Sequence, residues 1–96
     1  MVFSVKRIRH LYNFKSHILN CNGHRYHYLD EGLGNPIVML HGNPSWSFMY
    51  RDLVRTLSVS HRVIVPDHIG CGLSDKPSDR HYNYCLEQRV CDLEAL

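Results

Sequence analysis

The chain has 96 residues, which is enough for one small domain. Its apolar fraction of 44% and charged fraction of 21% are typical of a soluble globular protein. The formal net charge of +2, with no run of five like charges, argues against a nucleic-acid partner, and the longest apolar run is too short to span a membrane.

The first residues and the cysteine pattern bear on the cellular compartment. Residues 1–10 are basic, but no apolar stretch of about seven or more residues follows them, so we predict no signal peptide. No two cysteines form a Cys-x-x-Cys pair, and without a secretion signal we expect reduced thiols rather than disulfides. We therefore expect a cytoplasmic protein with free cysteines at Cys21, Cys71, Cys85 and Cys91.

The dipeptide Asn22-Gly23 marks a turn near the start of the chain. Strand-like segments flank it at residues 17–21 and 24–29. Both central residues of a two-residue hairpin turn need positive φ, which Asn and Gly adopt at least cost. The sequence therefore predicts a β-hairpin.

An alternation of strands and helices follows the hairpin. Continuous apolar runs predict buried strands, and apolar residues three and four apart predict helices. The predicted elements are a strand at 37–40, a helix at 47–57, a strand at 62–65 ended by Pro66, and a helix at 85–96. Two strands joined through a helix pair in parallel. We predict an α/β fold with a hairpin leading into a strand–helix–strand–helix unit and an incomplete, mostly parallel sheet. Residues 1–17 would be a lead-in to a domain at 18–96.

Each predicted helix carries apolar residues on one side. In the first helix the stripe consists of Trp46, Met49, Tyr50, Leu53, Val54 and Leu57. In the second helix Leu86, Val90 and Leu93 fall on one side.

The segment His41-Gly42-Asn43-Pro44 is the candidate functional site. It follows the predicted strand directly, and Gly42 allows a sharp turn there. Backbone amides released from the strand ladder form an anion-binding concavity, and the carboxamide of Asn43 adds two N–H donors. The alternative from composition is an ordinary turn capped by Asn43.

A second loop, at residues 66–77, contains Gly70-Cys71-Gly72 after the other predicted strand. A dinucleotide-binding fingerprint needs a third glycine, and Asp75 stands in its place. We therefore interpret this segment as a tight structural loop that shapes the rim of a pocket.

Metal and nucleophile motifs are not found in the sequence. His24 and His27 lie three apart on a predicted strand and so point to opposite faces, which argues against a shared metal ion. A Gly-x-Ser-x-Gly motif does not occur, and Ser45, Ser47 and Ser74 are interpreted as caps or turn residues. No Ser/His/Asp or Cys/His constellation can be assigned from the sequence alone.

Two motifs, at the spacing found here, carry a family resemblance. Residues 41–47 with Tyr50-Arg51, and residues 66–77, resemble the haloalkane-dehalogenase branch of the α/β-hydrolases. Residues 28–32 fit the same superfamily. The loop at 66–77 and the segment 89–96 are most similar to the β-lactone decarboxylases of long-chain olefin biosynthesis. The resemblance covers residues 18–96 and matches only the first third of a family member.

The resemblance implies a mechanism. In this family an Asp nucleophile attacks an alkyl carbon to form an ester, a halide or carboxylate anion departs, and water activated by a His hydrolyses the ester. Asn43 matches the residue that donates to the leaving anion and to the oxyanion, and Trp46 either lines the substrate pocket or packs in the core. The remaining motif residues are His41, Gly42, Pro44, Asp67, Gly70, Gly72 and Ser74.

The resemblance also implies what the chain lacks. The nucleophile, the acid and the base of the family would follow Leu96, so we expect the 96 residues alone to be inactive. The implied substrate is small and apolar, and neither a cofactor nor a metal is implied. An epoxide hydrolase, an esterase, and a non-catalytic remnant or interaction module stay open as alternatives. Epoxide hydrolases usually have an aromatic residue where Asn43 stands and Arg where Ile69 stands. Both differences favour the dehalogenase branch.

Overall fold

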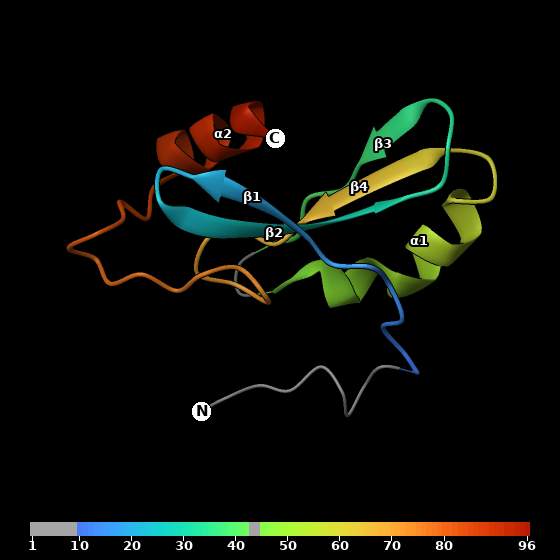
Figure 1. The fold of residues 1–96 in the computed structure, drawn as a ribbon, viewed down its shortest axis with the longest axis horizontal. Helices are drawn as coiled ribbons and strands as arrows, with labels where there is room; N and C mark the ends of the chain where they lie inside the picture. The colour runs from blue at the N-terminus through green and yellow to red at the C-terminus, as the bar shows by residue number, and fades with distance from the viewer. Residues whose placement is uncertain (1–9, 43–44) are drawn as a thin grey trace.

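The computed structural model describes residues 10–42 and 45–96, which form a four-stranded sheet with a helix on each face (Figure 1). The strands in chain order are β1 (His17–Cys21), β2 (His24–Glu31), β3 (Pro36–Val38) and β4 (Arg62–Pro66). Their order across the sheet is β1-β2-β4-β3. The predicted α/β class is confirmed.

The predicted hairpin is confirmed. Asn22 and Gly23 both have positive φ, 52° and 84°, and connect the antiparallel strands β1 and β2. Strand β2 runs to Glu31, two residues beyond the predicted end at residue 29. Strand β2 is longer because it also pairs with β4, where Glu31 lies opposite Val63.

The predicted parallel pair is confirmed in β3 and β4, where Ile37 faces Val63. Strand β3 is shorter than predicted, although the Met39 N–H still donates to Ile64 O at 3.0 Å and Leu40 lies outside the strand. Among the described strands, however, β1–β2 and β2–β4 are antiparallel. The sheet is mixed rather than mostly parallel because the hairpin pairs directly with β4.

The first predicted helix begins as a 3₁₀ turn, η2 (Ser47–Tyr50), and continues as α1 (Arg51–Leu57). Val54 is fully buried, but Met49 and Leu53 are 67% and 49% exposed, so the predicted stripe is only partly the packing face. A 3₁₀ turn has three residues rather than 3.6. The winding therefore differs from the assumed α period, and Phe48 packs on the core beside the stripe.

Two apolar clusters fill the faces of the sheet. The cluster toward α1 consists of Tyr12, Leu29, Val54, Val63 and Val65. The other cluster consists of Cys21, Tyr26, Ile69 and Tyr82. Tyr12 comes from the predicted lead-in, so part of this segment belongs to the core.

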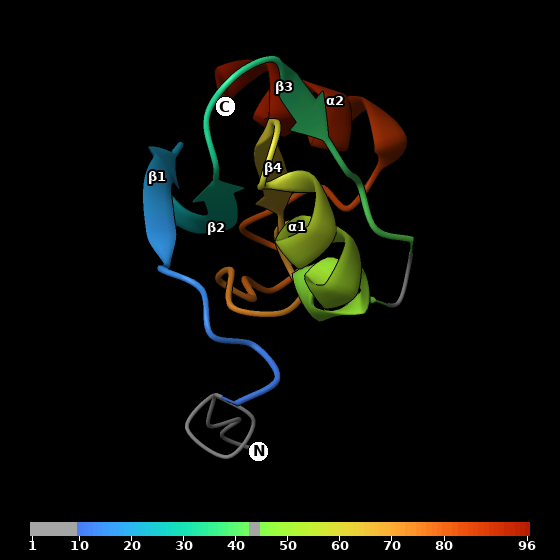
Figure 2. The same ribbon diagram turned by 90° about the vertical axis from the view of Figure 1, so that its right-hand side faces the viewer.

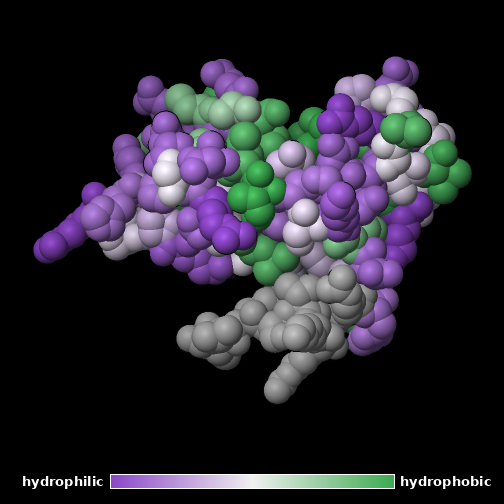
Figure 3. All heavy atoms as spheres, viewed as in Figure 1, coloured by the Kyte–Doolittle hydropathy of each residue, from purple (hydrophilic) through white to green (hydrophobic). Residues whose placement is uncertain are grey.

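The second helix, α2 (Leu86–Ala95), lies on the sheet face opposite α1 (Figure 2). Leu86 and Val90, on its apolar side, are 80% and 45% exposed. The buried residue of α2 is Asp92 instead. Apolar surface is accordingly visible over α2 among polar side chains (Figure 3). None of the described helices has the length and apolar character needed to cross a bilayer.

Candidate functional site

The candidate site lies where the parallel strands β3 and β4 end. The carboxyl ends of neighbouring parallel strands are the usual ligand-binding edge of an α/β sheet. An open cavity of about 420 Å³ lies at this edge, bounded by both post-strand loops and by the start of α2. Residues that line the cavity include His41, Gly42, His68, Gly70, Cys71 and Arg89. The structure thus brings together the two loops that the sequence singled out.

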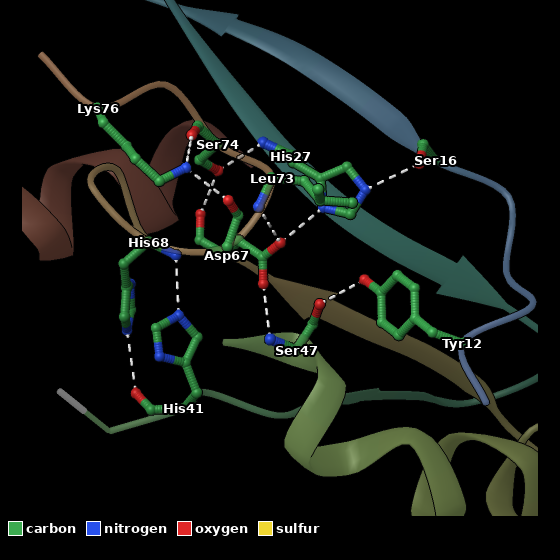
Figure 4. A network of polar contacts seen from close by, with 11 residues as sticks. Tyr12, Ser16, His27, His41, Ser47, Asp67, His68, Leu73, Ser74 and Lys76 are labelled. Atoms are coloured by element: carbon green, nitrogen blue, oxygen red, sulfur yellow. Dashed lines mark hydrogen bonds and ion pairs between the residues drawn. The ribbon is translucent and has the colours of Figure 1, made fainter. Parts of the chain in front are cut away.

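Asp67, directly after β4, is the centre of a buried hydrogen-bond network (Figure 4). Its Oδ1 accepts the Ser47 N–H at 2.6 Å, at the start of η2. Its Oδ2 accepts from His27 Nδ1 at 2.9 Å and from the Leu73 N–H at 3.1 Å. One carboxylate therefore joins β2, the start of the first helix and the loop after β4.

Asp67 carries its charge within the protein interior. Burial by itself raises the pKa of this carboxyl, but the hydrogen bonds from His27, Ser47 and Leu73 favour the charged form. The net result is a pKa below the ordinary value for Asp. The network is therefore held by an ionised group at neutral pH.

His41 and His68 hold each other across the ends of β3 and β4. Nε2 of His41 accepts the His68 backbone N–H at 3.0 Å, and Nε2 of His68 donates to His41 O at 3.2 Å. Because His41 Nε2 is an acceptor, its proton must lie on Nδ1, which donates to Gly42 O at 2.6 Å. Burial of the ring, together with the neighbouring His41 and the positive charge of Arg89, lowers the pKa of His68.

Contacts of this kind hold the described residues before and after the predicted anion-binding residue Asn43. His41 is held by His68, and Ser47 is held by Asp67, the residue that precedes His68. Asn43 and Pro44, the remaining predicted residues of this segment, lie outside the described residues.

The predicted residues Gly72 and Ser74 lie against Asp67, and Gly70 lies against Tyr84. Gly72 has φ 52°, and a Cβ there would lie 2.6 Å from the Asp67 carboxylate. Gly70 has φ 95°, and its Cβ would lie 2.7 Å from the Tyr84 ring. Ser74 Oγ donates to Asp67 O at 2.5 Å and accepts the His27 N–H at 2.8 Å. The loop after β4 thus folds tightly around its own first residue.

Trp46 lies at the edge of the core. Its ring packs against Tyr12 at 5.2 Å and Phe48 at 5.4 Å between centroids. These contacts favour the packing interpretation over a role in lining the pocket.

Sequence reasoning did not identify His27, His68 or Asp92 as structural centres. Asp92 accepts from Cys21 at 3.3 Å and also from Tyr82, and burial with this carboxylate raises the pKa of Cys21 to about 11. Each of the three residues has a partner far away in the sequence, so no local signal marks it. Within the described residues no group of three His, Cys, Asp or Glu side chains is placed to hold a metal ion.

Comparison with known proteins extends these observations. The cis-3-alkyl-4-alkyloxetan-2-one decarboxylase of Shewanella oneidensis is 63% identical over 83 residues, which are 86% of this chain and 26% of that protein. Haloalkane dehalogenase 2 of Mycobacterium tuberculosis is 45% identical over 80 residues, or 83% of this chain and 28% of that protein. A solved epoxide hydrolase, CorEH, superposes with a TM-score of 0.77 at 32% identity, covering 85% of this chain and 28% of that one.

The extent of these matches defines what they establish. This chain spans about a quarter of the length of the curated relatives that it matches. The pattern of the α/β hydrolase fold family matches residues 35–95, which include β3, η2, α1, β4 and α2. Together with the parallel pair and the site at its carboxyl edge, this match establishes that the chain belongs to the α/β hydrolase fold family.

Proposed function

We propose that this chain is part of a hydrolase of the haloalkane-dehalogenase and β-lactone-decarboxylase type. The observation that carries the proposal is that His41, which lines the 420 Å³ cavity, is held by His68, and that Ser47 is held by Asp67. The decarboxylase named above is 63% identical to this chain, and the haloalkane dehalogenase is 45% identical.

The proposed reaction of the full-length parent has two steps. An Asp nucleophile forms an ester with an alkyl carbon of a small apolar substrate, and the bond to the leaving halide or carboxylate breaks. With a haloalkane, water deprotonated by a His then hydrolyses the ester. With a β-lactone, the freed carboxylate leaves as carbon dioxide, its bonding electron pair forms the carbon–carbon double bond, and the Asp carboxylate departs. Asn43 would hold the departing anion through its side-chain N–H and stabilise an oxyanion through its backbone N–H.

We further propose that the 96 residues alone do not complete this reaction, and that the parent is cytoplasmic. The purified chain should neither release halide from a haloalkane nor decarboxylate a β-lactone above background, because no residue of the chain is assigned as the attacking Asp. Halide and carbon dioxide release from the full chain test this expectation, and sustained turnover of either substrate would contradict it.

Two alternatives lead to different observations. The likeness to an epoxide hydrolase structure favours epoxide opening as the second candidate. A non-catalytic remnant is the candidate from another class. Sequencing the DNA downstream of the Leu96 codon tests the remnant and a further alternative, an esterase. A continuous frame with Gly or His followed by Asp-Trp-Gly supports our proposal, Gly-x-Ser-x-Gly supports an esterase, and an immediate stop codon supports the remnant.

Substitutions at Asn43 in the full-length parent test the anion-donor role. Losing one such donor typically costs about 2.7–4 kcal/mol of transition-state stabilisation, or roughly 10²–10³ in kcat. Asn43→Ala should therefore lower kcat strongly and leave the melting temperature unchanged. Asn43→Asp should be at least as damaging, because it places a like charge against the leaving anion. A turn-capping Asn predicts the reverse, since Asp also caps well and Ala would cost about 0.5–2 kcal/mol of stability.

A further inference from the structure

Three side chains from distant parts of the sequence form a continuous line beside β2 (Figure 4). Ser16 Oγ lies 3.1 Å from Nε2 of His27, and Nδ1 of His27 lies 2.9 Å from Oδ2 of Asp67. The line is separate from the 420 Å³ cavity, whose lining includes none of the three residues.

The direction of each hydrogen bond in this line follows from its chemistry. An ionised carboxylate only accepts, so the proton between His27 and Asp67 lies on Nδ1 of His27. In the neutral imidazole Nε2 then carries no proton and accepts the hydroxyl proton of Ser16. A hydroxyl that donates to a histidine, oriented in turn by a carboxylate, is the arrangement of an activated nucleophile.

The surroundings hold this arrangement in place. The His27 backbone N–H donates to Ser74 Oγ at 2.8 Å, and its carbonyl accepts the Asp67 N–H at 2.8 Å. His27 and Asp67 are 1% and 0% exposed, whereas Ser16 is exposed. The base therefore has a fixed position in the interior, and the hydroxyl that it contacts faces solvent.

We propose that Ser16 is a nucleophile, with His27 as its base and Asp67 as the residue that orients His27. Its reaction partner is a compound with an activated phosphonyl or acyl group and a good leaving group. With a fluorophosphonate, Ser16 Oγ forms a bond to phosphorus, the phosphorus–fluorine bond breaks and fluoride leaves. The hydroxyl proton moves to Nε2 of His27, and the imidazolium is paired with the Asp67 carboxylate.

The reaction is a single modification rather than turnover. Nε2 of His27 is buried against Ser16, so it does not reach a leaving group or a water molecule in solvent. Fluoride departs without receiving a proton, which is why a fluorophosphonate suits this site. The inference does not depend on the proposed hydrolase reaction, which uses an Asp nucleophile.

The experiment treats the full chain with an alkyl fluorophosphonate and follows labelling by intact mass and peptide mapping. The chain contains a matched control, because Ser60 Oγ lies 2.8 Å from Nδ1 of His61 in an exposed pair. Among the described contacts that pair has no carboxylate partner. We expect Ser16 to be labelled at least about 100-fold faster than Ser60, the low end of general-base effects.

Two variants complete the test. Ser16→Ala should abolish the fast label, and His27→Gln should slow labelling of Ser16 by about 100-fold or more. Circular dichroism shows whether His27→Gln folds, and if it does not, the rate ratio of Ser16 to Ser60 in the wild-type chain decides. Equal rates at the two serines, or fast labelling that persists in a folded His27→Gln chain, would overturn the proposal. Ser16 would then serve only as the hydrogen-bond partner of a buried histidine.

Discussion

Substitution of Gly72 by Ala tests how tightly the loop packs around Asp67, because it adds one methyl group there. Its φ of 52° strains any other residue, and an added Cβ would lie 2.6 Å from the carboxylate and 2.8 Å from Trp46 Cβ. Gly23 is a matched control, with φ 84° and no atom within 4 Å of its Cβ. Gly23→Ala should cost about 1 kcal/mol from conformation alone. Gly72→Ala should cost about 1–3 kcal/mol more. Urea unfolding measures both, and equal losses would contradict the steric argument.

His68 makes the stability of the site depend on pH. Its pKa is lowered by burial, so the unfolded chain binds a proton at this residue more readily than the folded chain does. Its contribution to stability is present above the ordinary pKa of about 6.5 and is lost as pH falls toward the lower folded value. His68→Gln retains a donor for His41 O but does not titrate. The unfolding free energy of this variant should therefore fall less steeply than wild type between pH 7.5 and 5, and parallel curves would contradict the assignment.

At the scale of elements, α2 is held by polar contacts rather than by its apolar stripe. Cys21, Tyr82 and Gln88 all donate to the buried Asp92 carboxylate. Asp92→Ala would leave these donors without their acceptor, at a cost of about 1–3 kcal/mol or more. Leu86→Ala, at an 80% exposed position of the same helix, should change stability by less than about 0.5 kcal/mol. Thermal unfolding of the two variants measures the difference. A larger loss of stability for Leu86→Ala would show that the apolar side of α2 contributes more than the contacts of Asp92.

At the scale of the whole molecule, the outer edge of β3 is unpaired among the described strands. Val38 and Leu40 beside it are 49% and 42% exposed. An unpaired edge with apolar neighbours is a template for association. We expect the isolated chain to self-associate at micromolar concentration in sedimentation velocity, and Val38→Lys to reduce the association. A monomeric chain with a cooperative thermal transition would contradict this expectation.

Local sequence signals determined much of the fold. Asn22-Gly23 predicts the hairpin because two adjacent residues with positive φ are rarely anything else. The apolar runs at 37–40 and 62–65 predict the parallel pair, because strands joined through a helix are constrained to that arrangement. The loop motifs at 41–47 and 66–77 identify the family because glycines and polar residues at strand ends are set by local backbone geometry.

The tertiary structure alone decided which side chains are buried together. Asp67 was a motif residue in the sequence, but its partners His27 and Ser47 lie 40 and 20 residues away, and hydrogen bonds between distant segments leave no periodic signal. The exposed stripe of α2 has the same origin, because apolar periodicity shows that a helix has a face but not what stands opposite it. A buried carboxylate such as Asp92 is stable only where three donors converge, and the path of the chain determines that convergence.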